Sequence, residues 1–180
     1  MYILTIFSFL IIMVSQSFSD IIYKDDFKNP GSWTFVSDKV MGGVSSGQVV
    51  FQSKDDENYA HISGNVSTKN NGGFIQIRRK FNNINLQKAN FIKIIVKGNN
   101  QKYFIHFRTS GTILPWQYYQ LGFIVDEEFK EIKLSINEFN RSSSFLAKII
   151  NPKNIRSLGI VAFGRDHTAE LYIKSIEFIE

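Results

Sequence analysis

A glycine-rich loop with one carboxylate is the stretch of this sequence best equipped to hold another molecule. Residues 33–47 read Trp-Thr-Phe-Val-Ser-Asp-Lys-Val-Met-Gly-Gly-Val-Ser-Ser-Gly. Gly42 and Gly43, which follow Met41, allow another group to approach the main chain closely. Asp38 provides a carboxylate and Ser45 a hydroxyl on either side of this corner. Such loops often carry function on a rigid scaffold; the alternative is a buried β-turn in which the carboxylate caps backbone N–H groups.

Side chains able to bind polar groups also recur on predicted strands, on the faces opposite the apolar ones. From residue 74 to 81, apolar and polar residues alternate with a period of two, which puts Ile75 on the core face and Arg78 on the opposite face. The segments 103–109 and 117–125 alternate in the same way. The side chains expected on the opposite faces are Phe74, Gln76, Arg78, Phe104, His106, Arg108, Tyr118 and Gln120.

If these strands are neighbours, their outward side chains form one polar and aromatic surface. Arginine presents a planar fork of N–H donors for carboxylate, phosphate or backbone groups, and aromatic rings offer faces for sugars or side chains. The alternative is an ordinary solvated face, which antiparallel sheets commonly have. We predict one functional surface that joins this face to the glycine-rich loop. The full set of predicted binding residues is Asp38, Met41, Gly42, Gly43, Ser45, Gly73, Phe74, Arg78, His106, Arg108, Trp116, Tyr118 and Gln120.

The residues present give little support to catalysis. The chain has no cysteine, so thiolate catalysis is excluded. Its three histidines, His61, His106 and His167, show no metal-ligand spacing. Asp38 and Asp166 are the two loop carboxylates to consider for glycoside hydrolysis, which needs two facing acids. We therefore predict a non-enzymatic protein without metal or cofactor, and a hydrolase that uses Asp38 is the least supported alternative.

The composition is typical of a single β-rich domain. Of 180 residues, 17 are phenylalanine and only three are proline, and the Ile, Phe, Val and Tyr content favours strands over helices. Short strands separated by turn signals predict an all-β, antiparallel β-sandwich over residues 20–180. The net charge of +5 comes mostly from scattered lysines, with one basic run at residues 78–80. This pattern does not favour nucleic-acid binding.

Two connections are expected to be hairpin turns. The segments 91–97 and 103–109 are predicted to pair with each other, because the Gly-Asn-Asn at residues 98–100 is a good turn sequence. The polar stretch 54–58 carries three consecutive acids. We interpret it as a solvated hairpin tip and not a calcium loop, because no repeat of oxygen ligands accompanies the acids.

The N-terminal segment is predicted to direct export. Residues 1–19 are apolar and uncharged, and Ser17-Phe18-Ser19 puts small residues at both positions that a signal peptidase reads. The pattern indicates a secretory signal peptide cleaved after Ser19, and hence a secreted or periplasmic protein without a stable membrane span. The alternative is an uncleaved membrane anchor formed by residues 2–18. A mitochondrial presequence is not indicated, because the segment contains no arginine.

Several short motifs, in a fixed order, resemble those of a known family. They are Trp33, Ser37-Asp38, Val40-Met41-Gly42-Gly43 and Ser45, then Gly72-Gly73-Phe74 with Arg78, the strands 103–108 and 119–123, and the region of Gly159 and Ile176. With them the chain resembles the complex I intermediate-associated protein 30 family from about residue 20 to residue 180. Departures from the family's usual residues occur at Phe129, Ser135 and Ile136.

The resemblance implies a galactose-binding-like jelly roll and a protein-binding, assembly-factor role. The predicted export differs from the mitochondrial location of the family's best-known member. The same type of sandwich also hosts carbohydrate-binding modules, which is an analogy at the level of the fold. Two kinds of partner therefore stay open from the sequence, a protein and a glycan.

Export is tested at the N-terminus of the mature protein. Because the apolar segment ends at Ser17-Phe18-Ser19, N-terminal sequencing of the native protein should begin at Asp20. Detection of Met1 in a membrane fraction would favour the anchor, and a full-length cytoplasmic protein would contradict export.

Overall fold

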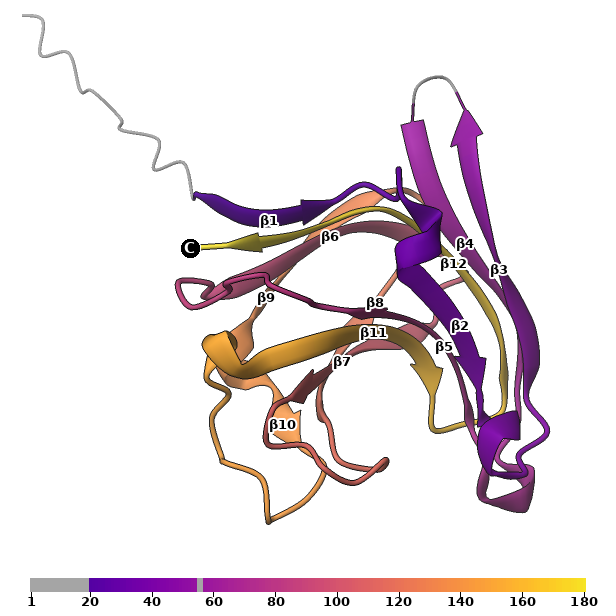
Figure 1. Cartoon of the computed structure of the whole chain (residues 1–180). Coiled ribbons are helices and arrows are strands. Elements are labelled where there is room, and N and C mark those ends of the chain that lie inside the picture. Colours follow the sequence, from indigo (N-terminus) through magenta and orange to yellow (C-terminus); the bar gives the residue numbers. More distant parts are fainter. Residues whose placement is uncertain (1–19, 55–56) are drawn as a thin grey trace, which may run out of the picture.

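The computed structural model describes residues 20–54 and 57–180 (Figure 1). The predicted signal peptide and the tip of the predicted turn at 54–58 lie outside these ranges. In the described part of the chain, no helix has the length and apolar character needed to cross a membrane.

Two antiparallel sheets of six strands each make up the protein, which confirms the predicted all-β sandwich. The first sheet has the order β3 (Ser46–Lys54), β4 (Glu57–Val66), β12 (His167–Ile179), β6 (Phe91–Gly98) and β9 (Lys130–Ser135), with β1 (Ile21–Asp25) paired to the end of β12. The second sheet has the order β10 (Asn140–Arg141), β8 (Tyr119–Ile124), β7 (Lys102–Thr109), β11 (Ile155–Phe163), β5 (Phe74–Lys80) and β2 (Trp33–Ser37).

Short 3₁₀ turns connect several of these strands. They are η1 (Pro30–Ser32), η2 (Asp38–Met41), η3 (Lys69–Asn71), η4 (Ile136–Glu138) and η5 (Pro152–Asn154). The turns η2 and η3 lie side by side at one end of the sandwich, at the lower right of Figure 1. η2 leads towards the start of β3 in the first sheet, and η3 leads towards the start of β5 in the second sheet.

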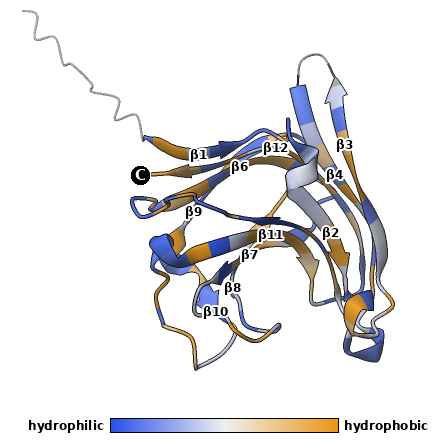
Figure 2. Ribbon diagram, viewed as in Figure 1, coloured by the Kyte–Doolittle hydropathy of each residue, from blue (hydrophilic) through white to orange (hydrophobic). Residues whose placement is uncertain are grey.

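The core lies between the sheets and is built from one side of each strand. Ile75 on β5 and Tyr103, Ile105 and Phe107 on β7 are fully buried, as their alternation predicts. Figure 2 shows apolar and polar residues alternating along the strands. Side chains between these positions point away from the first sheet, and we call this side the outer face of the second sheet.

The predicted pairing of segments 91–97 and 103–109 is wrong. β6 pairs with β12 and β9 in the first sheet, whereas β7 pairs with β11 and β8 in the second sheet. The connection between them crosses from one sheet to the other, held by a hydrogen bond from Gly98 N to Asp126 O of 2.7 Å. Alternation fixes which face of a strand is buried and not which strand lies beside it, so both segments fit either arrangement.

A buried ion pair joins the two sheets near the N-terminal end of the fold. Asp25, at the end of β1, accepts hydrogen bonds from the backbone of Phe27 and the indole of Trp33, each at 2.9 Å. The same carboxylate pairs with Arg79 on β5. Arg79 is thus committed to the structure, while its neighbour Arg78 points to the outer face.

The assignment of faces on β5 can be tested by a pair of adjacent substitutions. Ile75→Asp should unfold the domain, because an unpaired charge in the packed core costs several kcal/mol against a total stability of ~5–15 kcal/mol. Gln76→Asp, on the outer face, should lower the melting temperature far less. Equal losses of melting temperature in the two variants would contradict the assignment.

Candidate functional site

The Asp38 carboxylate is the centre of the glycine-rich loop, and it is fully buried. Its Oδ1 accepts a hydrogen bond from Ser45 N at 3.0 Å, and its Oδ2 accepts bonds from Ser45 Oγ at 2.5 Å and Gly73 N at 2.6 Å. A longer bond of 3.3 Å comes from Phe74 N, the first residue of β5. One carboxylate therefore fastens the loop after β2 to the loop before β5.

Glycines surround this carboxylate because no side chain fits beside it. A Cβ atom at Gly43 or at Gly72 would overlap the Asp38 carboxylate. Gly42 has a φ of 89°, the left-handed region that favours glycine, and ends η2. The glycines that the sequence suggested for contact with a ligand instead make room for Asp38 and for the turn.

The charge on Asp38 is stabilised by its hydrogen bonds. Burial opposes ionisation of this carboxyl, but the bonds from the surrounding hydroxyl and N–H groups outweigh it and lower the pKa of Asp38 below its ordinary value. Since Asp38 and Ser45 are both fully buried, neither can touch a ligand in this structure. The alternative of a buried turn capped by Asp38 describes what the structure shows.

Met41 is the part of this loop that reaches the surface. Its side chain is 61% exposed and lies next to exposed Val40. Gly73 lies immediately before β5 and donates its N–H to Asp38. Of the predicted loop residues, Asp38 and Ser45 are therefore buried and hold the loop in place, whereas Met41 is an exposed apolar side chain.

The predicted strand residues come together on the outer face of the second sheet. The backbone register places Arg78 of β5 opposite Gly159 of β11, and Gly159 opposite His106 of β7. His106 in turn lies opposite Gln120 of β8. One residue row away, Ser157 of β11 lies opposite Arg108. Four neighbouring strands therefore present one continuous surface.

Aromatic rings pack against one another across this surface. His106 stacks on Tyr118 with ring centroids 4.2 Å apart and an angle of 8° between the planes. Phe163, at the end of β11, meets His106 edge-on at 5.4 Å and Phe104 at 5.8 Å. Phe163 is paired in register with Phe74, which extends the aromatic row towards the Asp38 loop. Phe163 is not among the predicted binding residues, because residues 158–163 contain no polar side chain and their pattern does not distinguish the two faces of the strand.

A small cavity lies between the two arginines of this face. Its volume is about 70 Å³, and its lining residues are Gln76, Arg78, His106, Arg108, Pro115, Tyr118, Ser157 and Gly159. Arg108 donates from one NH2 group to the backbone oxygens of Thr112 and Leu114, at 3.3 and 3.0 Å. Burial and the nearby charge of Arg78 lower the pKa of Arg108. The two guanidinium groups therefore face the same small space.

His106 contributes an uncharged ring to this cavity. Burial lowers the pKa of His106 to about 4, so the ring is neutral at physiological pH. His106 Nε2 and Gln120 Oε1 are both buried. The two residues lie opposite each other on β7 and β8, and a hydrogen bond with the Gln120 side chain offsets part of the effect of burial on the pKa of His106.

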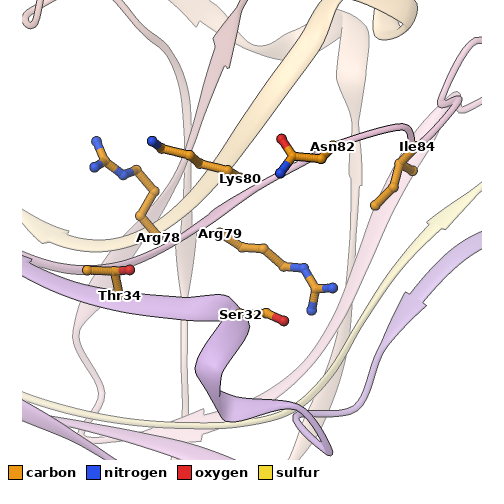
Figure 3. A pocket seen from close by; sticks show the side chains of 7 residues that line it. All are labelled: Ser32, Thr34, Arg78, Arg79, Lys80, Asn82 and Ile84. Atoms are coloured by element: carbon orange, nitrogen blue, oxygen red, sulfur yellow. The ribbon is translucent and has the colours of Figure 1, made fainter.

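A larger cavity continues along β5 from Arg78. It has a volume of about 400 Å³, and Figure 3 shows the lining residues Ser32, Thr34, Arg78, Arg79, Lys80, Asn82 and Ile84. Arg78 and Lys80 point to the same side of the strand in this view, whereas Arg79 points to the other side. Among residues 20–54 and 57–180, neither Arg78 nor Lys80 takes part in an ion pair. An Asp38–Arg78 ion pair inside a purely structural turn, which is the alternative to a functional surface, is not formed between these described residues.

Trp116 lies on the loop that closes one end of the outer face. Its side chain is 63% exposed. The Oγ of Ser142 donates to Trp116 O at 2.9 Å and accepts from Tyr118 N at 3.0 Å. Gln117 Oε1 accepts from two backbone N–H groups of the same loop, those of Ile113 and Leu114. These bonds hold the exposed indole in place.

The two carboxylates considered for glycoside hydrolysis, Asp38 and Asp166, lie in different surroundings. Asp166 accepts hydrogen bonds from Thr68 N and Oγ1 at 2.7 and 2.8 Å, on the surface, while Asp38 is buried. The two carboxylates are therefore not a pair that faces a shared substrate. Within residues 20–54 and 57–180, no group of three or more His, Asp or Glu side chains is arranged to hold a metal ion. What the outer face can do is donate hydrogen bonds and stack on a bound molecule.

The fold is that of a jelly-roll β-sandwich, and several solved structures share it. A family 11 carbohydrate-binding module from Clostridium thermocellum, in complex with a β-1,3-1,4-mixed-linked tetrasaccharide, is similar with a TM-score of 0.71 and 14% identity over 91% of this chain and 97% of that chain. The family 11 module of the cellulosomal cellulase Lic26A-Cel5E of Clostridium thermocellum gives 0.70 and 14% over 92% and 97%. A family 30 module gives 0.54 and 8% over 76% and 92%. At these identities the likeness shows the jelly-roll fold alone.

The sequence itself identifies the family. The model of the complex I intermediate-associated protein 30 (CIA30) family matches residues 20–173. The chain belongs to this family, as its motifs indicated. No curated protein matches the chain.

The supporting role of Asp38 predicts a large and pH-dependent loss of stability on substitution. Asp38→Ala leaves buried N–H groups unpaired, at a cost of about 1–3 kcal/mol for each, whereas Asp26→Ala removes an exposed ion pair and should cost little. Because the folded pKa of Asp38 is lowered, the stability it adds is present above the ordinary carboxyl pKa and is lost as the pH falls through the lowered value. The gap in unfolding free energy between wild type and Asp38→Asn should therefore shrink in acid. A gap that stays constant with pH would contradict this role.

Proposed function

We propose that this protein is an exported, non-enzymatic binding protein that holds a protein partner on the outer face of its second sheet and assists the assembly of a complex. The observation that carries the proposal is the pair Arg78 and Arg108, which face one cavity and make no ion pair with any described residue. Buried or half-buried arginines are normally paired with acids when their task is structural. Here Arg79 has such a partner in Asp25, and its neighbour Arg78 does not.

The rigidity of the surface supports binding. The candidate residues lie on β5, β7, β8 and β11, whose backbones are hydrogen-bonded on both sides. Sites built on strands are more rigid than sites on loops, and a rigid surface loses less conformational entropy when a partner binds. Membership of the CIA30 family supports a protein partner and an assembly role.

A glycan is the second candidate ligand, and one structural observation favours it. Phe104, Tyr118 and Phe163 lie half-buried along the same outer face, and aromatic rings are common platforms for sugars. The similar solved structures are carbohydrate-binding modules, one of them with a bound tetrasaccharide. In this structure the face of His106 already stacks on Tyr118, so part of the aromatic area is used internally.

The proposal predicts variants that lose the partner and keep their fold. Arg78→Ala and Arg108→Ala should each abolish recovery of the partner in pull-downs from the native extracellular or envelope fraction, with a nearly unchanged melting temperature. Lys133→Ala, which removes a positive charge from the first sheet, is the matched control and should retain the partner. A large loss of stability with binding kept per folded molecule would overturn the proposal.

A glycan array on the same proteins separates the two candidates. Defined sugar ligands that are lost in both arginine variants would favour the carbohydrate-binding module. A defined protein complex without sugar ligands would favour the assembly role.

A further inference from the structure

The outer face of the second sheet carries positive charge that the described residues do not neutralise. Lys80 and Arg78 alternate on the same side of β5, and Arg108 lies two strands away on β7. No acidic residue lines either of the two cavities that these side chains share. A charge held in a partly desolvated cavity attracts an anion more strongly than a charge in open water does.

The shape of the cavity suits one small planar anion. Gly159 forms part of its floor, where a Cβ would come within 2.8 Å of Gln76 Oε1. The volume of about 70 Å³ is enough for a group the size of a carboxylate and too small for a sugar ring. His106 is neutral and adds an uncharged ring to the lining. The space between the arginines therefore has the size and the positive charge to suit a small anionic group.

Arg108 is already oriented for such a group. The carbonyls of Thr112 and Leu114 hold one of its NH2 groups, and Pro115 of the same loop lines the cavity. The other donors of the guanidinium make no hydrogen bond to a described residue. A guanidinium with a fixed plane loses little entropy when it forms a two-pronged bond with a carboxylate.

Exposed apolar side chains lie on the loop that contributes Pro115 to this cavity. Ile113 is 83% exposed and Trp116 63%, both on the loop that orients Arg108. Phe145, which is 92% exposed, lines a separate cavity together with Thr109 and Tyr119. Residues 109–118 contain no charged residue, and residues 141–156 contain Arg141, Lys148, Lys153 and Arg156 but no acid. The surface therefore combines an anion cavity, an apolar rim and a fringe of positive charge.

We propose that this surface binds an acidic segment of a polypeptide partner, with one Asp or Glu carboxylate between Arg78 and Arg108 and neighbouring apolar side chains against Ile113 and Trp116. The inference rests on the proposed binding function and adds the chemistry of the partner. The apolar rim favours a polypeptide over an acidic polysaccharide, because uronate chains have no bulky aliphatic groups to cover it. Exposed apolar patches rimmed by polar residues are typical of protein–protein contacts.

The test uses the fluorescence of Trp116, because the second tryptophan, Trp33, is buried in the core. The probes are a short tryptophan-free peptide of alternating Glu and Leu, the same peptide with Gln for Glu, and polygalacturonate as a source of carboxylates without apolar groups. The Glu peptide should bind and change the Trp116 emission, and the Gln peptide should bind about tenfold more weakly or worse, since charge-assisted hydrogen bonds are lost. Raised salt should weaken the binding of the Glu peptide.

Variants assign the effect to the cavity. Arg78→Gln and Arg108→Gln should each weaken binding of the Glu peptide about tenfold or more, whereas Lys133→Gln on the first sheet should bind like wild type. Melting curves of all three variants show that they are folded. Equal binding of the Glu and Gln peptides, or unchanged binding in both arginine variants, would overturn the inference.

Two further results separate this inference from the proposed function. Tight binding of polygalacturonate without binding of the Glu peptide would assign the carboxylate to a glycan and overturn the polypeptide partner. If the Glu peptide does not bind while a native partner is still recovered by wild type and lost in Arg78→Ala, the binding function stands and the acidic partner is wrong.

Discussion

The buried carboxylate of Asp38 is the constraint on which the arrangement of this protein depends. Two segments that are far apart in the sequence, the loop after β2 and the loop before β5, meet at its oxygens. An ionised carboxylate in the interior is tolerable only when its hydrogen-bonding capacity is filled, so Ser45 and Gly73 must supply their donors in a fixed geometry. This requirement sets where β5 begins, and through the alternation of that strand it also sets which side Arg78 faces.

The residues that hold the Asp38 loop together are different from the residues of the proposed binding surface. Groups that hold the loop, such as Asp38 and Ser45, are fully buried and have no capacity left for a ligand. Groups without an ion-pair partner among the described residues, such as Arg78 and Arg108, lie on the outer face of the second sheet. In the proposed function, the binding groups therefore lie on rigid strands, while the loops fix the ends of those strands and orient Arg108.

The sequence predicts which face of each strand is buried, but it does not predict which strands pair with each other. Alternation is a local property, so it placed Ile75 inside and Arg78 outside. Pairing is decided by the whole fold, and the segments 91–97 and 103–109 therefore gave a false hairpin although each is a strand. The partners of Asp38 could not be predicted either, because Gly73 lies 35 residues further along the chain and nothing local indicates that the two meet. The exposed state of Trp116 likewise depends on Ser142 in a distant loop.

Most of the motifs that indicate the family lie around the buried Asp38 carboxylate and not on the proposed binding surface. The motifs that identify the chain as a member of the CIA30 family include Asp38, Gly43, Ser45 and Gly72-Gly73, and these residues either bind the Asp38 carboxylate or leave room for it. These motifs therefore describe the structural contact between the loop after β2 and the loop before β5. A protein with this fold and loop needs that contact whatever ligand it binds. Ligand choice then depends on side chains that this contact does not constrain, on the outer face and its adjoining loops. Among the residues of the motifs, Phe74 and Arg78 lie both on β5, the strand that begins at Asp38's hydrogen bonds, and on the outer face, so they connect the structural part of the motifs to the proposed binding surface.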